Sequence, residues 1–253
     1  MYHSISWEQR KRVLSYFETN TYPSVFEQQM RFLTEKGYVP CNLHDLPVLD
    51  LAGSRKKYFV VTFDDGFHDF RTNALPVLRE YNVPATVFLP TGYMGPPRKS
   101  FKNRPCLDWN EVRELSRDGV CFGSHSHNHA ELRMGSAQAL ENELRISKEL
   151  IENEIGLPVF SFSYPYAFPS STDRSFLKLL RELMVEIGYS IGVTTMIGSY
   201  TPGSDLLALR RIPVNTHDDA LSLEAKMEGG YDPIYYFQSI YKRLAMRTGR
   251  SVG

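Results

Sequence analysis

The sequence has few cysteines, and their number and spacing argue against two kinds of architecture. Three cysteines occur among 253 residues, at Cys41, Cys106 and Cys121. Because the count is odd, the positions are far apart and no Cys-x-x-Cys pair occurs, neither a disulfide framework nor a thiolate zinc site is indicated. We therefore interpret all three as small buried apolar residues.

An excess of charge of either sign is also absent. Lys and Arg total 29 and Asp and Glu total 29, which gives a formal net charge of zero. A protein that binds nucleic acid usually carries a basic excess, so we expect no nucleic-acid partner. The balanced charges are typical of a mixed, solvated surface.

Long hydrophobic runs are missing as well. No apolar stretch approaches the roughly 20 residues that cross a bilayer, and no basic segment followed by an apolar run opens the chain. We expect no membrane span, and the chain as given predicts a cytoplasmic protein. A secreted or periplasmic protein given without its export signal would look the same. The oligomeric state is left open.

What the sequence does contain is a regular alternation of short apolar strands with amphipathic helices. This alternation predicts parallel βαβ units, and their number favours one barrel-like domain. No repeat, linker or break in composition divides the chain, so we predict a single catalytic domain over 1–253, with 215–253 as a helical C-terminal extension. The predicted strands are 56–66, 84–90, 120–125, 159–165, 189–195 and 207–214, and the predicted helices are 24–36, 69–82, 109–119, 136–156 and 171–188.

Polar clusters follow three of the predicted strands. Asp64 and Asp65 end the apolar stretch VVTF, HSHNH follows VCFGS, and YPYAF follows VFSFS. In barrels of this kind, functional groups collect at the C-terminal ends of the strands. Two adjacent buried carboxylates are costly unless a cation, a proton or hydrogen-bond donors compensate them. Capping of the following helix would explain one aspartate but not both.

The histidine-rich segment supplies candidate metal ligands. His125 and His129 are spaced to converge on one ion, whereas His127 is expected to point elsewhere, as a supporting group or toward solvent. A histidine-rich loop alone is more often a solvated surface loop. Two histidines with one carboxylate, however, form a known catalytic zinc set that leaves a position open. One aspartate would then bind the ion, and the other would act as general base.

The segments TFDDG and HSHNH resemble the first two motifs of the polysaccharide deacetylases, the nodulation-protein-B homology group of carbohydrate esterases (family four). In that family the first Asp of the first motif is the catalytic base and the second is a metal ligand. The resemblance therefore implies Asp64 as base and Asp65 as ligand. The outer histidines of the second motif bind the metal, which implies His125 and His129.

The resemblance covers about residues 1–215 and implies an α/β fold, a distorted (β/α) barrel with seven strands in place of the usual eight. The family's third motif, R-x-P-[YF], corresponds to SYPY, with Ser163 where the Arg would be. The match implies that the backbone N–H of Tyr166 stabilises an oxyanion, while Pro165 and the rings of Tyr164 and Tyr166 shape the substrate groove.

Two roles in the active site are less well marked in the sequence. LRRIPV resembles a strand of the family branch whose third motif lacks Arg, which implies that Arg211 orients the base. Neither a D-x-x-D-W segment nor a clear L-x-H strand is evident. His217, in NTHDD, is therefore one candidate for the general acid, and His3, in YHSI, is the other. Either could instead be a packing or surface histidine.

These residues predict a metal-dependent hydrolase that removes N-acetyl groups from amino sugars, with a carbohydrate as its partner and substrate. The ion is expected to be zinc, with cobalt, nickel or manganese as alternatives. One rival hypothesis is a deacylase of a small or lipid-linked intracellular sugar amide. Another is a catalytically idle carbohydrate-binding relative that stacks sugars on the aromatic residues Trp109, Tyr164, Tyr166 and Phe168.

Overall fold

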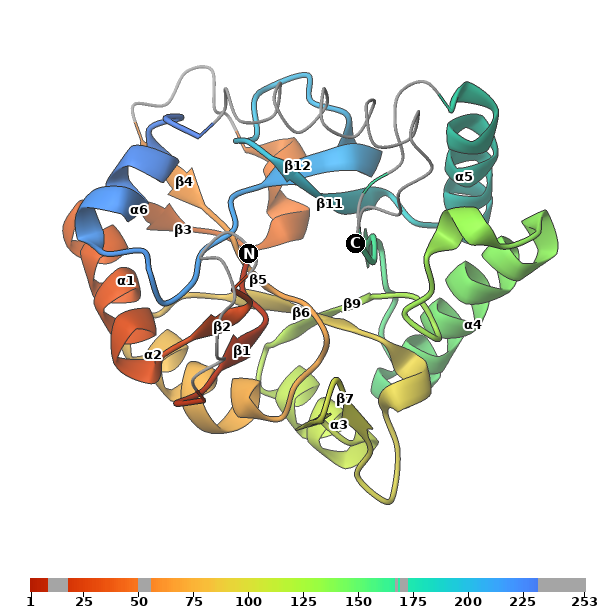
Figure 1. Cartoon of the computed structure of the whole chain (residues 1–253), viewed down its shortest axis with the longest axis horizontal. Helices are drawn as coiled ribbons and strands as arrows, with labels where there is room; N and C mark the ends of the chain where they lie inside the picture. The colour runs from red at the N-terminus through yellow and green to blue at the C-terminus, as the bar shows by residue number, and fades with distance from the viewer. Residues whose placement is uncertain (9–17, 50–55, 167, 169–172, 232–253) are drawn as a thin grey trace.

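The centre of the molecule is a parallel six-stranded sheet that curls into a barrel (Figure 1). The structure, a computed structural model, describes all residues except 9–17, 50–55, 167, 169–172 and 232–253. The strand order is β12-β11-β10-β9-β6-β5, and every neighbouring pair is parallel. The strands are β5 (Val61–Phe63), β6 (Ala85–Leu89), β9 (Cys121–Ser124), β10 (Ser161–Ser163), β11 (Ile191–Ile197) and β12 (Leu209–Arg211).

The first residues of the chain close this barrel. On one side, the carbonyl of Tyr2 accepts a hydrogen bond from the N–H of Asp64 at 3.0 Å, just after β5. On the other side, the carbonyl of Met1 accepts one from the N–H of Val214 at 3.1 Å, just after β12. The N-terminal segment therefore lies as a seventh strand between the two edges of the sheet, which agrees with the predicted seven-stranded barrel.

The helices surround the outside of the sheet (Figure 1). In α1 one face is buried against the core, since Phe26, Met30 and Leu33 are at most 3% exposed. The predicted helix 69–82 is split between a π-helical turn, η3, and α2. The helical segments are α1 (Pro23–Glu35), η3 (Phe70–Ala74), α2 (Leu75–Glu80), α3 (Trp109–Arg117), α4 (Ala137–Ile155), α5 (Arg174–Ile187) and α6 (Ala220–Met227). No helix in the described ranges is both long and apolar enough to span a membrane.

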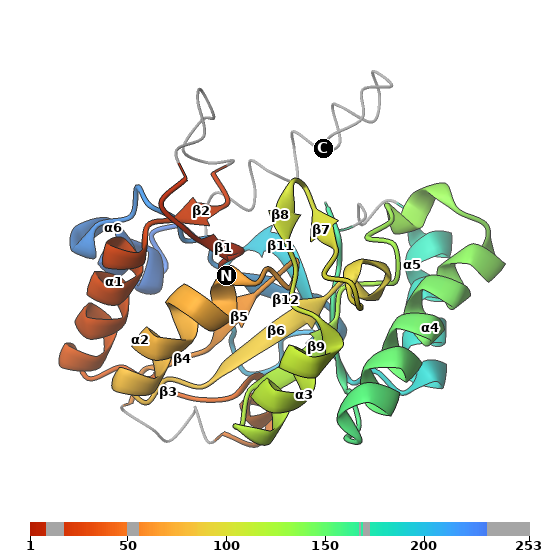
Figure 2. The ribbon, with the colours of Figure 1, turned by 90° about the horizontal axis from the view of Figure 1, so that it is seen from below.

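Three small two-stranded sheets accompany the barrel. The predicted strand 56–66 divides into β4 and β5, because β4 pairs with β3 instead of with the main sheet. Figure 2 shows the β1–β2 and β7–β8 ribbons on the same side of the main sheet. The strands are β1 (Ser4–Ile5) with β2 (Asn20–Thr21), β3 (Val39–Pro40) with β4 (Tyr58–Phe59), and β7 (Ser100–Phe101) with β8 (Arg104–Pro105).

The remaining elements are short 3₁₀ helices. The described part of the C-terminal extension contains α6. The predicted extension beyond residue 231 lies outside the described residues. All three cysteines are free; Cys41 and Cys106 are buried as predicted, whereas Cys121 is only half-buried. The 3₁₀ helices are η2 (Leu43–Val48), η4 (Thr91–Tyr93), η5 (Leu132–Met134) and η6 (Leu206–Ala208).

Candidate metal centre and active site

Three buried side chains converge at the C-terminal ends of β5 and β9. Asp65 follows β5, and His125 and His129 follow β9. The Oδ1 atom of Asp65 lies 3.6 Å from Nε2 of His125 and 3.2 Å from Nε2 of His129. The backbone of Asp65 and of His129 is left-handed, with φ of 71° and 52°. This conformation is energetically unfavourable for a non-glycine residue, and such backbone strain is concentrated at functional sites.

The three residues fit a divalent cation. The Oδ1 atom of Asp65 is buried without a hydrogen-bond donor of good geometry, which leaves its charge available to an ion. The Nδ1 atom of His125 lies 2.8 Å from the carbonyl of Ser163, so this ring is held with Nε2 toward the centre. Burial alone would raise the pKa of Asp65, but the nearby rings of His125 and His129 and the charge of Lys102 hold that pKa well below its usual value. The carboxylate is therefore ionised and ready to bind a metal.

The second carboxylate, Asp64, is paired with Arg211. The guanidinium donates to both carboxylate oxygens, at 2.8 and 2.7 Å. The hydroxyl of Ser163 donates to Asp64 at 3.2 Å and accepts from Arg211 at 3.0 Å. Arg211 is itself fixed by donation from Nε to the carbonyl of Thr194 at 2.9 Å. The structure thus places Arg211 beside the expected base, and Ser163, which occupies the arginine position of the third motif, bonds to both residues.

This pairing determines the charge of Asp64. Burial would raise the pKa of the carboxyl, but the charge of Arg211 and its hydrogen bonds, together with His125, hold that pKa well below its usual value. Asp64 is therefore an ionised carboxylate next to Asp65. The two adjacent charges are compensated separately. Asp64 has a bidentate arginine, and Asp65 has the ammonium of Lys102, 3.0 Å from its Oδ2 atom, beside the two histidines.

The residues of the third motif are split between the site and the core. Tyr166 is 46% exposed, and its ring stands edge-on to His129 at 4.8 Å between centroids. Pro165 is buried next to it. Tyr164, by contrast, is 2% exposed, and its hydroxyl donates to the carbonyl of Leu207 at 2.8 Å. The expectation that Tyr164 shapes the groove is therefore corrected: its ring points into the core behind β10.

The two candidate acids lie in different places. Burial lowers the pKa of His3 to about 4, and the negative charges of Asp65 and Asp64 oppose that shift, which places His3 within electrostatic reach of both carboxylates. His217 lies on an exposed turn, where its backbone N–H donates to the side chain of Asn215 at 2.9 Å. Among the described residues, no contact connects His217 with the metal centre.

Sequence reasoning missed Lys102, which lies at the tip of the β7–β8 hairpin. Its ammonium is 3.0 Å from Oδ2 of Asp65 and 4.7 Å from the centre of the Phe101 ring, which in turn contacts His129. Lys102 and Asn103 both adopt the positive φ of a tight hairpin turn. Asn is typical of such turns, so the Lys-Asn pair was the only feature of the sequence that could have indicated the hairpin. His127 points away from the centre, as expected, and contacts the hydroxyl of Thr91 at 2.9 Å.

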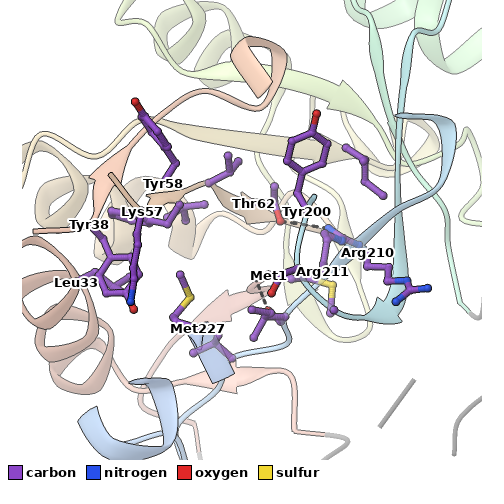
Figure 3. Close-up of a pocket in the computed structure, with 18 of the residues that line it drawn as sticks. Met1, Leu33, Tyr38, Lys57, Tyr58, Thr62, Tyr200, Arg210, Arg211 and Met227 are labelled. Atoms are coloured by element: carbon purple, nitrogen blue, oxygen red, sulfur yellow. Dashed lines mark hydrogen bonds between the residues drawn. The ribbon is translucent and has the colours of Figure 1, made fainter. Parts of the chain in front are cut away.

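A large cavity lies elsewhere and is distinct from this centre. Its volume is about 510 Å³, and it lies among β4, β5, β12, α1 and α6, with Arg211 and Thr62 in its wall (Figure 3). None of Asp64, Asp65, His125 and His129 lines it. The cavity therefore adjoins the arginine that supports Asp64, but it does not contain the residues of the proposed chemistry.

A parallel β/α barrel with an Asp-His-His set beside a second ionised Asp defines a metal-dependent hydrolase. The chain belongs to the polysaccharide deacetylase family, whose sequence profile matches residues 52–188. The predicted family, fold class and type of enzyme are thereby confirmed, and the family is metal-dependent.

Particular relatives span most of the chain. The YxkH protein of Bacillus subtilis (strain 168) is 29% identical over 218 residues, 85% of this chain and 70% of that protein. The poly-β-1,6-N-acetyl-D-glucosamine N-deacetylase of Staphylococcus aureus (strain N315) is 25% identical over 218 residues, 82% of this chain and 71% of that enzyme.

Two solved structures share the fold. The deacetylase PplD of Streptococcus pyogenes, in complex with acetate, superimposes with a TM-score of 0.75 at 22% identity, over 89% of this chain and 95% of that one. IcaB from Ammonifex degensii superimposes with a TM-score of 0.74 at 22% identity, over 90% of this chain and 95% of that one. Both support the barrel architecture described above.

Proposed function

We propose that this protein removes acetyl groups from N-acetylglucosamine residues of a polysaccharide or oligosaccharide. The observation that carries the proposal is the pair of adjacent carboxylates, of which Asp64 is neutralised by Arg211 and Asp65 faces His125 and His129. A protein that only bound a metal or a sugar would not need the second ionised carboxylate. The substrate named for the Staphylococcus aureus relative supports the choice of amino sugar.

Asp65, His125 and His129 would hold the ion, and zinc is the metal that this donor set suits best. When bound, such an ion acts as a Lewis acid on the amide carbonyl and lowers the pKa of water at the site. The side chains around it supply the remaining requirements: a base, donors for the oxyanion and an acid for the leaving amine.

Asp64 is the proposed base. Its carboxylate accepts the proton of the attacking water, while Arg211 and Ser163 keep it oriented. The oxygen of the water bonds to the carbonyl carbon, and the backbone N–H of Tyr166 donates to the oxyanion that forms. The C–N bond then breaks, the amine takes up a proton, and acetate is released.

His3 is the proposed acid, because it is the candidate that lies within electrostatic reach of Asp64 and Asp65. Its imidazole is neutral at pH 7, since burial lowers the pKa to about 4. The proton that it gives to the leaving amine is therefore the one that Asp64 takes from the attacking water and passes on to it. His217, on its exposed turn, is less well placed for this role. Mutation of each histidine in turn separates the two assignments.

The rival hypothesis of an idle sugar-binding protein loses part of its support. Two of its four stacking residues, Trp109 and Tyr164, are at most 9% exposed and cannot present a ring to a sugar. Deacylation of a small sugar amide uses the same catalytic residues, so the choice of substrate must be made by experiment.

The test is acetate release from N-acetylglucosamine oligomers and from small N-acetyl sugars by metal-loaded protein. Asp64→Asn is run beside it, with Asp118→Asn as matched control, because Asp118 pairs with Arg79 on the surface. We expect release by the native protein and the control, and loss with Asp64→Asn or a chelator. Release from small sugars but from no oligomer would overturn the polymer assignment.

A further inference from the structure

Trp7 is an exposed aromatic residue that nothing in the proposed mechanism uses. It is 68% exposed and follows β1. One side of its indole stacks on the ring of Tyr22, with 6.0 Å between centroids and 22° between planes. Leaving a side chain of this size in water forgoes a large hydrophobic stabilisation, so a well-held exposed tryptophan suggests a binding role.

The backbone around Trp7 is held firmly. The side-chain amide of Asn20 donates to the carbonyls on both sides of it, that of Ser6 at 2.8 Å and that of Glu8 at 3.0 Å. Arg104, which is 5% exposed, donates to the amide oxygen of Asn20 at 3.2 Å and pairs with the carboxylate of Glu8 at 2.8 Å. This buried polar network fixes the position of the indole before any ligand arrives, which lowers the entropic cost of binding.

Trp7 lies at the same rim as the metal centre. Tyr2 runs parallel to β5, so the chain beyond His3 passes the C-terminal edge of the sheet, where Asp65 lies. Three residues lie between His3 and Trp7, so four Cα-to-Cα steps limit the distance between their Cα atoms to roughly 14 Å. Arg104, which anchors the segment, belongs to the hairpin whose tip residue, Lys102, contacts Asp65.

The surroundings favour a sugar over a protein or lipid surface. Among the described residues of β1, β2, the β7–β8 hairpin and the turn after β1, Trp7 is the only exposed large apolar residue. Apart from Tyr22, which stacks on the indole, the residues beside it include the polar or charged Ser6, Glu8 and Asn20. Protein docking and membrane insertion use wider apolar patches, whereas a pyranose ring needs one aromatic face for its C–H groups and polar neighbours for its hydroxyls.

We propose that Trp7, backed by Tyr22, is a sugar-binding subsite that stacks on a pyranose ring of the substrate, a few sugar units from the residue that loses its acetyl group. The inference rests on the proposed function, because it requires a substrate longer than one sugar. It makes Trp7 a residue that selects for chain length and takes no part in the chemistry.

The experiment compares kcat/KM on a series of N-acetylglucosamine oligomers of increasing length. Trp7→Ala should lower the ratio of kcat/KM for long over short oligomers by about tenfold, mainly through KM, and Trp7→Phe should restore much of it. The matched control is Phe160→Ala, an aromatic residue that is 49% exposed and precedes β10, at the other end of the barrel. This control should leave the ratio unchanged.

Direct binding separates failure of this inference from failure of the proposed function. Affinity for the longest oligomer is measured by calorimetry on metal-loaded Asp64→Asn, with and without Trp7→Ala, so that no turnover is needed. Weaker binding with Trp7→Ala supports the subsite even if no acetate is released. An unchanged affinity and length ratio, or an equal loss at every length, would overturn it.

Discussion

At the scale of single residues, the main finding is how the two adjacent carboxylates are compensated. Asp64 is neutralised by Arg211 of β12, which lies 147 residues further along the chain. Because the guanidinium also bonds to Ser163 and Thr194, it is fixed before the substrate binds. A serine in the third motif is therefore compatible with an oriented base, provided that another strand supplies the cation.

Loss of Arg211 should destabilise the protein severely. Arg211→Met would leave the buried carboxylate of Asp64 without its counter-charge, which typically costs about 3–5 kcal/mol. Arg181→Met is the matched control, because Arg181 also pairs with a carboxylate, that of Asp205, but both side chains are more than 40% exposed. The control should cost less than about 1 kcal/mol. Chemical denaturation measures both, and similar costs for the two variants would contradict this account.

His3 should make the metal-free protein sensitive to mild acid. Burial lowers its pKa to about 4 in the folded state, from an ordinary 6.5. Between these pH values His3 is protonated in the unfolded chain but neutral in the folded protein. The free energy of unfolding therefore falls as the pH drops from about 6.5 to 4. Asp64 and Asp65, whose pKa values are lowered, lose their contribution only below about pH 4.

The measurement is the thermal unfolding midpoint of the metal-free protein between pH 7.5 and 4.5. His3→Gln should lose less stability over this range than the native protein. The contribution of His129, whose pKa is also lowered, is present in both proteins and cancels in the comparison. Parallel pH profiles for the two proteins would show that His3 is not buried as a neutral imidazole.

At the scale of elements, the positions of the main strands could be predicted because hydrophobic runs and helical periodicity are local signals. The β7–β8 hairpin could not, since its two-residue strands have no periodicity. Lys102 was missed for the same reason. Arg211 was reached only through resemblance to a family, because its partner Asp64 is distant in sequence. Exposure of Trp7 and burial of Tyr164 depend on packing, which no local pattern reports.

Gly192 in β11 should tolerate no side chain, because η6 packs directly against it. A Cβ there would overlap the carbonyl oxygen of Leu207 and lie 2.9 Å from its carbonyl carbon. That backbone cannot move away freely, because the same carbonyl accepts the hydroxyl of Tyr164. At Gly203 the space is open, so Gly203→Ala should cost only the strain of its positive φ, about 1–2 kcal/mol of stability. Gly192→Ala should therefore destabilise the protein by more than Gly203→Ala.

Both glycine variants are compared by urea denaturation and by acetate release. Gly192→Ala should also reduce activity, because β11 carries the Thr194 carbonyl that holds Arg211. If the two variants lose equal stability, the close contact between β11 and η6 does not constrain the fold.

At the scale of the whole molecule, the seventh strand joins the first and last strands of the main sheet, β5 and β12. Tyr2 is bonded to the residues after β5 and Met1 to the residues after β12, so the first and last strands of the barrel share one partner. The same segment carries His3 toward the carboxylates and leads to Trp7. Closure of the barrel and assembly of the proposed site therefore depend on the same few residues.

This arrangement predicts that the described chain unfolds as one cooperative unit, as the single-domain hypothesis requires. Neither half of the barrel can lose its edge strand without exposing the core of the other. Far-UV circular dichroism and fluorescence of the two tryptophans, Trp7 on the rim and Trp109 in α3, should give coincident urea transitions. Tyr2→Ala, which removes a ring packed between Phe26 and Phe63, should shift both transitions together. Two separated transitions would show instead that the halves fold independently and that the N-terminal segment only bridges them.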